Sequence, residues 1–215
     1  NLVRVPKKQT ALISDFELKR DRIARETMTK NITNISGVPS WMLSVLTRVM
    51  ELSGKNHLEE VWPNIEMFFH GGVAFTPYRK QYEQLIKSPN MHYMETYNAS
   101  EGFFGLQNDP TDKSMLLMLD YGVFYEFIPM DEFGRENPTV VPLWGVETNK
   151  NYAMVISTSS GLWRYIIGDT VMFTSVNPYK FVITGRTKHF INAFGEELIV
   201  DNAEQGLAYA CQQTG

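Results

Sequence analysis

The sequence contains a single cysteine, Cys211, in 215 residues. One cysteine excludes an internal disulfide bond and any cysteine-based metal cluster, which fits a reducing compartment. No apolar run approaches the ~20 residues that a membrane-spanning helix needs, and the first residues lack the basic and then apolar pattern of a signal peptide. We therefore expect a cytoplasmic protein without a membrane-spanning segment.

Basic charge is also scarce. The chain carries 20 Lys and Arg against 24 Asp and Glu, a net charge of −4, and its one basic run, 4–8, is short. A general nucleic-acid surface would need clustered cations, so we expect no nucleic-acid partner. The four histidines show no metal-ligand spacing, and we interpret them as structural or surface residues: they are His57, His70, His92 and His189.

The composition is that of a globular protein, with 43% hydrophobic, 13% aromatic and 20% charged residues. A chain of 215 residues is long enough for one large domain, or for one domain plus a fragment. It starts with Asn1 rather than Met and closes on Gln-Gln-Thr-Gly. We expect a piece of a longer protein.

Strand and helix patterns alternate along the first hundred residues. The expected helices are 15–30, 41–52 with Ser40 as its cap, and 76–86 with Pro77 in its first turn. The expected strands are 32–36, 65–70 and 92–97. This alternation predicts an α/β fold with a parallel sheet and crossover helices.

Three polar or glycine-rich loops would then follow the carboxyl ends of these strands, where ligands bind in such sheets. They are Gly37-Val38-Pro39, Gly71-Gly72 and the stretch from Asn98 to Glu101. After residue 102 the pattern changes to short β-like runs separated by turns, as at Asn177-Pro178. These runs predict a smaller, β-rich subdomain of antiparallel hairpins or a small barrel.

Two further stretches carry candidate chemistry. Residues 97–102 read Tyr-Asn-Ala-Ser-Glu-Gly, a turn with one carboxylate behind a strand, which is either a ligand loop or an ordinary strand end. Residues 160–169 end in Gly168-Asp169, where an aspartate can accept two hydrogen bonds from a vicinal diol or can simply cap a hairpin. A third stretch, the charged segment that starts at Gly185, is by itself also consistent with an interdomain linker.

Four segments, in this order and spacing, resemble the adenylate-forming (acyl-CoA synthetase/luciferase-like) superfamily. They are GVPSWMLSVLTRVMELSGK at 37–55, YNASEG at 97–102, SGLWRYIIGD at 160–169 and GRTKHFINAFGEEL at 185–198. Together they look most like bacterial homologues of the plant auxin-responsive acyl acid amido synthetases. The resemblance implies an ATP-dependent ligase that activates a carboxylic acid as an acyl-adenylate and passes it to an amine, usually of an amino acid.

The resemblance also implies roles for individual residues. Glu101 would be the magnesium ligand or phosphate-region carboxylate, Asp169 would hold the ribose, Arg186 would bind ribose or phosphate, and Lys188 occupies the hinge position. The remaining residues would line the nucleotide or the wall between adenine and acyl group: Tyr97, Asn98, Ala99, Ser100, Tyr165, Gly71, Gly72 and Val73. ATP and Mg²⁺ are the expected substrate and cofactor.

This sequence departs from the family pattern in two places. Ile166 follows Tyr165 where the superfamily often has Arg, and nothing before residue 37 resembles the upstream phosphate-binding loop. We therefore expect 1–186 to be a partial N-terminal adenylation domain, with an α/β part at about 1–102 and a β-rich part at about 103–186. Residues 187–215 would hold the hinge and the start of a truncated C-terminal lobe, with a helix from Asp201 or Asn202. Such a piece alone is expected to be inactive.

Three functions stay open at this point. An acid–amine ligase is favoured by the four segments together. An acid–thiol ligase that transfers the same adenylate to coenzyme A would share every nucleotide residue named. A non-catalytic nucleotide-binding module is the third, because the phosphate loop is missing. The sequence does not identify the acid, the acceptor or the oligomeric state.

Overall fold

The computed structural model describes residues 4–187, 190–193, 196–199, 206 and 209–211. The chain divides into two compact units, Asn1–Met94 and Glu95–Gly215, and the division falls within strand β3 (His92–Ala99). The division into adenylation domain and C-terminal lobe remains a prediction. Lys188 and the helix expected from Asp201 or Asn202 lie outside the described residues. In the part of the chain that the structure describes, no helix is long and apolar enough to cross a membrane.

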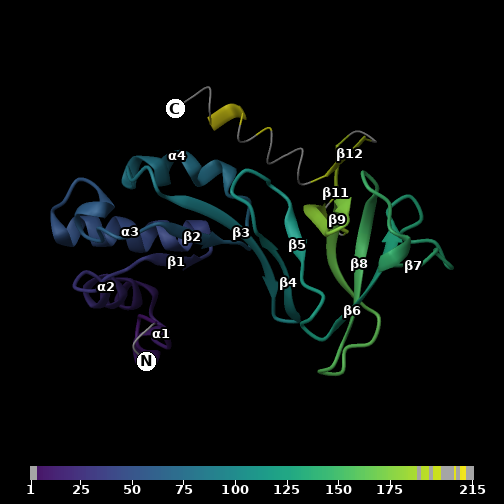
Figure 1. Ribbon diagram of the computed structural model, residues 1–215, viewed down its shortest axis with the longest axis horizontal. Helices are drawn as coiled ribbons and strands as arrows, with labels where there is room; N and C mark the ends of the chain where they lie inside the picture. The colour runs from purple at the N-terminus through teal and green to yellow at the C-terminus, as the bar shows by residue number, and fades with distance from the viewer. Residues whose placement is uncertain (1–3, 188–189, 194–195, 200–205, 207–208, 212–215) are drawn as a thin grey trace. The chain divides into compact units, whose positions relative to one another are not determined.

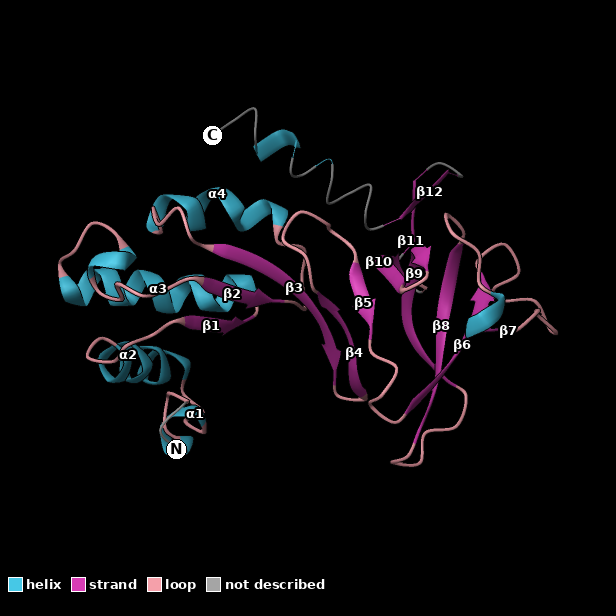
Figure 2. Cartoon of the chain, in the orientation of Figure 1, coloured by secondary structure: helices cyan, strands magenta, loops and turns pink. Residues whose placement is uncertain are grey.

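The first unit contains helices α1 to α4 and two short parallel strands (Figures 1 and 2). Its elements are α1 (Lys8–Ala11), α2 (Phe16–Thr27), β1 (Asn34–Gly37), α3 (Pro39–Ser53), the 3₁₀ turn η1 (Leu58–Glu60), β2 (Met67–His70) and α4 (Thr76–Leu85). Every helix and strand expected before residue 90 is present, with bounds shifted by a few residues.

Local chemistry accounts for the helix boundaries. Asp15 caps α2, because its carboxylate accepts a hydrogen bond of 2.7 Å from the Leu18 N–H. The expected cap of α3 at Ser40 is wrong: the N-cap is Val38, and Ser40 lies inside the first turn behind Pro39. Proline fits this position because its missing N–H would have no partner there.

The two strands of the first unit are parallel, with Gly37 opposite His70 at their carboxyl ends. The sequence prediction of parallel pairing is confirmed for this pair. The first residue of β3 joins the same sheet, since the His92 N–H donates to the Glu66 carbonyl at 2.8 Å. Helix α4 is tied to the start of α3 by the buried Tyr82 hydroxyl, which donates to the Pro39 carbonyl at 2.7 Å.

The second unit is built from antiparallel strands, drawn in magenta in Figure 2. Besides β3 they are β4 (Gly102–Gln107), β5 (Met115–Leu117), β6 (Val123–Pro129), β7 (Val141–Pro142), β8 (Asn151–Thr158), β9 (Tyr165–Val176) and β10 (Tyr179–Arg186), with the 3₁₀ turn η2 at Leu143–Gly145. The strand order is β3-β4-β5-β10-β9-β8-β6-β7. A separate pair, β11 (Phe190–Ala193) and β12 (Glu196–Ile199), is also antiparallel.

An aromatic core fills one face of this sheet. Its fully buried rings include Phe104, Phe127, Tyr152, Phe173 and Phe181. Edge-to-face contacts such as Phe127–Phe173, with ring centroids 5.0 Å apart, add to the apolar burial. This core fixes the register of the strands that carry the candidate site.

Three features of the second unit differ from the sequence expectations. The sheet is open rather than barrel-like, because β3 and β7 stand at opposite ends of the strand order without pairing among the described strands. The β-rich unit also begins at Glu95, before residue 103, since antiparallel pairing begins within β3. Finally, Asp169 lies inside β9 rather than in a turn.

Candidate functional site

Tyr97 lies at the centre of the candidate site, on β3 of the second unit. Its side chain points into the aromatic core and only 6% of the residue is exposed. The ring packs against Phe104 and Phe181, with centroid distances of 5.0 and 6.1 Å. Gly105 lies opposite Tyr97 in the sheet, and a Cβ there would sit only 2.7 Å from Phe181 Cζ. The ring is therefore held in one place by its neighbours.

The Tyr97 hydroxyl leaves this core to meet Asp169. It donates a hydrogen bond of 2.5 Å to Asp169 Oδ2, across 72 residues of sequence. Burial raises the pKa of Tyr97 well above its usual value, and the charge of Asp169 and the hydrogen bond to it raise this pKa further. The tyrosine is thus a neutral donor at every physiological pH.

The second oxygen of Asp169 faces Arg186. The two residues are direct partners in the β9–β10 pair, and Arg186 Nε lies 3.4 Å from Asp169 Oδ1. Only 15% of the Asp169 side chain is exposed, against 53% for Arg186. The Asp169 carboxylate therefore has the Tyr97 hydroxyl at one oxygen and the Arg186 guanidinium near the other.

The backbone before Asp169 is fixed by a local loop closure. Gly168 has φ of +92°, a conformation that disfavours side chains, and a Cβ there would lie 3.3 Å from an Arg186 guanidinium nitrogen. Its carbonyl accepts from the Thr187 N–H at 2.8 Å and from the Thr187 hydroxyl at 3.4 Å. Glycine at 168 thus lets Arg186 approach the carboxylate.

Glu101 lies in the turn that joins β3 to β4. Ala99 pairs with Gly102, so Ser100 and Glu101 form a two-residue hairpin loop rather than the longer loop expected from the sequence. The expected loop is wrong at its start, because Asn98 and Ala99 continue the strand. The charge of Glu101 nevertheless reaches the Tyr97 hydroxyl, where it contributes to the raised pKa of Tyr97.

A chain of side-chain hydrogen bonds beside the site was missed by sequence reasoning. The Thr184 hydroxyl donates to Asn151 Oδ1 at 2.6 Å and is hydrogen-bonded to the Thr170 hydroxyl at 2.9 Å. Thr170 is 4% exposed and follows Asp169 directly in β9. Thr187 was missed too, although it stands between two residues that the resemblance singles out. No local pattern distinguishes these threonines from ordinary strand residues.

The predicted site residues thus fall into several groups. Tyr97, Asp169 and Arg186 are in contact, and Glu101 is within electrostatic reach of them. The other residues of the loop and of the Gly-Asp segment flank this cluster: Asn98 and Ser100 are exposed, Ala99 packs on the core, and Tyr165 is 41% exposed at the start of β9.

Gly71, Gly72 and Val73 lie in the first unit, directly after β2. A Cβ at Gly72, which has φ of +84°, would lie 3.4 Å from Val38 Cγ2, so two of the three loops expected to converge do come together. Val73 is 42% exposed beside them. Their predicted role in an adenine and acyl wall remains a prediction.

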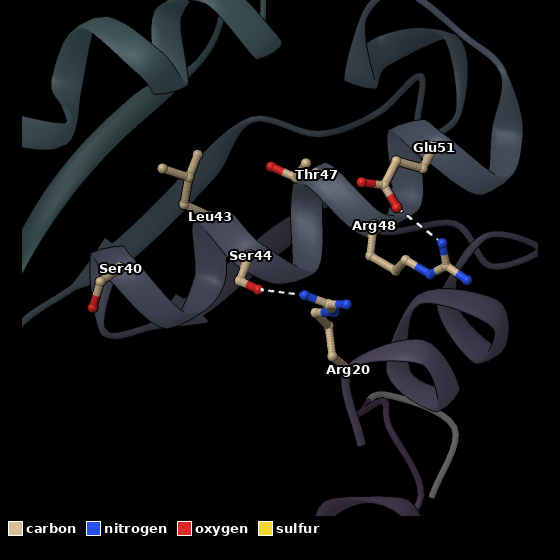
Figure 3. Close-up of a pocket in the computed structure, with 7 residues that line it drawn as sticks. All are labelled: Arg20, Ser40, Leu43, Ser44, Thr47, Arg48 and Glu51. Atoms are coloured by element: carbon tan, nitrogen blue, oxygen red, sulfur yellow. Dashed lines mark hydrogen bonds and ion pairs between the residues drawn. The ribbon is translucent and has the colours of Figure 1, made fainter. Parts of the chain in front are cut away.

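A cavity of about 340 Å³ opens on the first unit between α2 and α3, and Figure 3 shows the residues that line it. It contains Arg20 and Arg48, but both are already paired with carboxylates. Arg48 binds Asp21 at 2.7 Å and Glu51 at 2.8 Å, while Arg20 is paired with Glu17. These pairs neutralise the cations, so we assign this cavity no anion-binding role.

The residues present are compatible with the magnesium ion that the resemblance implies. Mg²⁺ bound with substrate phosphates commonly takes one or two protein carboxylates, and Glu101 is a partly exposed carboxylate at a turn. In the described part of the chain, no group of three or more His, Cys, Asp or Glu residues is able to hold a metal. The donor set fits an ion coordinated mainly by phosphate oxygens.

Comparison with solved structures identifies the class of proteins that share this fold. A structure described as "AtGH3.15 acyl acid amido synthetase in complex with 2,4-DB" matches 91% of this chain with a TM-score of 0.73 and 17% identity, over 43% of its own length. A 2-hydroxyisobutyryl-CoA ligase in the postadenylation state matches 92% with a TM-score of 0.66 and 15% identity, over 41% of its length. The fold is that of the adenylate-forming ligases.

Within that class, the chain belongs to the GH3 family. The GH3 family N-terminal domain matches residues 1–91 and the GH3 family central domain matches residues 116–186, most of the chain together. This confirms the resemblance found in the sequence.

Curated relatives from Arabidopsis thaliana include indole-3-acetic acid-amido synthetase GH3.3, 28% identical over 175 residues, which cover 75% of this chain and 28% of that protein. Another is 4-substituted benzoates-glutamate ligase GH3.12, 31% identical over 142 residues, 60% of this chain and 24% of that protein. The chain spans about a quarter of the length of these relatives.

Proposed function

We propose that this chain is the nucleotide-binding part of an ATP-dependent acid–amine ligase, which activates a carboxylic acid as acyl-AMP and transfers it to an amino acid. The observation that carries the proposal is the contact of Tyr97, Asp169 and Arg186. These residues come from three separate segments, and Asp169 presents carboxylate acceptors next to a cation. That arrangement suits a ribose and the phosphate beside it.

In the first step a carboxylate oxygen of the acid attacks the α-phosphorus of ATP. The new bond is O–Pα, the broken bond links Pα to the oxygen that bridges to the β-phosphorus, and pyrophosphate leaves with that electron pair. Asp169 holds the ribose hydroxyls, and the half-exposed Arg186 is placed to offset phosphate charge. Glu101 would hold Mg²⁺, which would supply further neutralisation of phosphate charge.

In the second step the amine nitrogen attacks the acyl carbon of the adenylate. A C–N bond forms, the acyl C–O bond to AMP breaks, and the nitrogen loses a proton to a base. The residues predicted to wall adenine from the acyl group, Gly71 to Val73, and the hinge residue Lys188 belong to this proposal as well. A cytoplasmic location completes it and fits a chain with one cysteine.

Transfer to coenzyme A is the second candidate, because the fold matches the 2-hydroxyisobutyryl-CoA ligase structure almost as well. Both functions share the adenylation step and the nucleotide residues. The acceptor distinguishes them.

The test measures exchange of labelled pyrophosphate into ATP by the whole protein with a panel of carboxylic acids. Acid-dependent exchange is the expected result. Amide formation with amino acids, followed by mass spectrometry, then supports the ligase, whereas thioester formed only with coenzyme A supports the second candidate. Absence of exchange with every acid, together with retained ATP binding, would leave a non-catalytic nucleotide-binding module.

A further inference from the structure

We propose that Tyr97 is a positioning residue whose hydroxyl fixes the Asp169 carboxylate so that its two remaining acceptor sites face the 2′- and 3′-hydroxyls of a ribose. The inference rests on the proposed function, because it concerns the same nucleotide site. It gives Tyr97 a different role from the one that the resemblance implies, which is to line the nucleotide.

Burial argues against direct contact between Tyr97 and a nucleotide. Only 6% of the residue is exposed, and its ring lies between Phe104 and Phe181 within the core of the second unit. A stacking surface for adenine would need an exposed ring face. The polar end of the side chain is committed to Asp169 instead, at 2.5 Å.

Counting acceptor sites explains the match to a diol. An ionised carboxylate offers about four lone-pair sites, two on each oxygen. The Tyr97 hydroxyl occupies one site on Oδ2, and Arg186 Nε faces Oδ1 at 3.4 Å. At least one site on each oxygen is left, and a vicinal diol has two O–H donors on adjacent carbons. The remaining sites therefore suit the two ribose hydroxyls in number and arrangement.

An anchor of this kind is needed because the terminal torsion of an aspartate is broad. Without the Tyr97 hydroxyl, the Asp169 carboxylate would rotate about its side-chain torsions toward Arg186, the half-exposed cation beside it. The backbone below it is already fixed by the two hydrogen bonds from Thr187 to the Gly168 carbonyl. Tyr97 thus supplies the side-chain restraint that the backbone does not.

The main variant is Tyr97→Phe, which keeps the packed ring and removes only the oxygen. Affinities for ATP, 2′-deoxyATP and 3′-deoxyATP are measured by titration calorimetry on the protein. We expect the variant to lose roughly fivefold in ATP affinity, as for one hydrogen bond to a charged group. The preference for ATP over either deoxy nucleotide should fall by a similar factor, because the misplaced Asp169 carboxylate no longer accepts hydrogen bonds from both ribose hydroxyls.

Tyr125→Phe is the matched control. Tyr125 belongs to the same core, is 3% exposed, and its hydroxyl donates to the Met118 carbonyl at 3.0 Å. Removing this oxygen should cost comparable stability yet leave the ratio of ATP to deoxyATP affinity unchanged. A general loosening of the core would instead lower affinity for all three nucleotides alike in both variants.

The outcomes separate the inference from the proposed function. If the unmodified protein binds no ATP, the proposed function fails. If it binds ATP and discriminates against the deoxy nucleotides, while Tyr97→Phe keeps the same ratio, the positioning role is overturned. Asp169→Asn and the double variant with Tyr97→Phe complete a cycle: the two losses should be strongly non-additive, and additive losses would also overturn the role.

Discussion

Asp169 lies directly opposite Arg186 in the β9–β10 pair, with Arg186 Nε 3.4 Å from Asp169 Oδ1. The two residues belong to two sequence segments, 160–169 and 185–198, that carry the resemblance separately. The hairpin at Asn177-Pro178 brings the segments together, and Gly168 leaves room for the guanidinium. The β9–β10 pair thus places Asp169, which can accept hydrogen bonds from hydroxyls, beside Arg186, a cation suited to phosphate.

Asp169→Asn should weaken ATP binding by roughly 10- to 100-fold, because an amide keeps the shape but loses the charge and half of the acceptor capacity. Calorimetric titration with ATP measures the loss. Asp112→Asn is the control, since Asp112 is also an ion-paired carboxylate of the second unit, 2.8 Å from Lys180 Nζ. Equal losses in both variants would argue against a ribose contact at Asp169.

Glu101→Ala should abolish acid-dependent pyrophosphate exchange in the whole protein while leaving its circular dichroism spectrum unchanged. The reason is that the phosphates lose the carboxylate that accompanies their counter-ion. Glu147→Ala serves as the comparison, because Glu147 is a carboxylate of the same unit whose side chain is 73% exposed. Normal exchange by the Glu101 variant would show that this residue is only part of a turn.

Gly105→Ala should destabilise the second unit by about 1–3 kcal/mol, the usual cost of overpacking. The added methyl group would lie 2.7 Å from Phe181 Cζ and 3.2 Å from Met115 Cβ, and both side chains are buried. Urea unfolding followed by circular dichroism measures the change. The control is Gly206→Ala, where no atom of the described residues lies within 4 Å of the new Cβ. A midpoint unchanged by Gly105→Ala would refute this packing.

His70 should make the first unit less stable in mild acid. Burial, with a smaller contribution from Arg79, lowers the pKa of His70 from 6.5 to about 4, so the folded state keeps it neutral. Between these values the unfolded state binds more protons, and the free energy of unfolding therefore falls as pH drops from about 6.5 toward 4. The loss is at most about 3 kcal/mol.

Urea midpoints at pH 7 and pH 5 test this expectation in the unmodified protein and in His70→Phe. The aromatic replacement preserves stacking on Phe75, whose ring centroid lies 4.2 Å away, and should reduce the pH dependence. The exposed His92 provides the control through His92→Gln, which should leave the pH dependence intact. Identical slopes in all three proteins would rule out His70 as the source.

The 215-residue chain alone should bind ATP weakly and should not catalyse adenylation. It spans 43% of the AtGH3.15 structure, and removal of even one preorganised donor to a developing charge costs ~10²–10³ in rate. The chain is incubated with ATP, Mg²⁺ and carboxylic acids, and pyrophosphate release is measured. Turnover equal to that of a full-length relative would contradict the expectation.

Residue patterns predicted the first unit well. The apolar spacing of three and four in residues 41–52 gave α3, and the β-like runs before Gly37 and Gly71 gave β1 and β2. These elements are set by contacts near in sequence, where periodicity and punctuation by glycine or proline are informative. The cap of α3 differs from the prediction because proline at 39 already starts the helix, two residues earlier than expected.

The second unit was harder to predict because its order depends on pairing between distant segments. The sequence pattern predicts a turn over 97–102, whereas β3 continues to Ala99 and Gly102 starts β4 of the same hairpin. Short strands of similar composition fit several sheet orders, open or closed, equally well by local pattern. The aromatic core selects one of them.

The sequence by itself determined the family, the alternation of strands and helices, and the identity of the carboxylates and cation of the candidate site. Only the tertiary structure decided that the Tyr97 hydroxyl meets Asp169 and that Arg186 lies across from it. The physical reason is that a contact spanning 72 residues depends on strand register and core packing, and no local spacing specifies either.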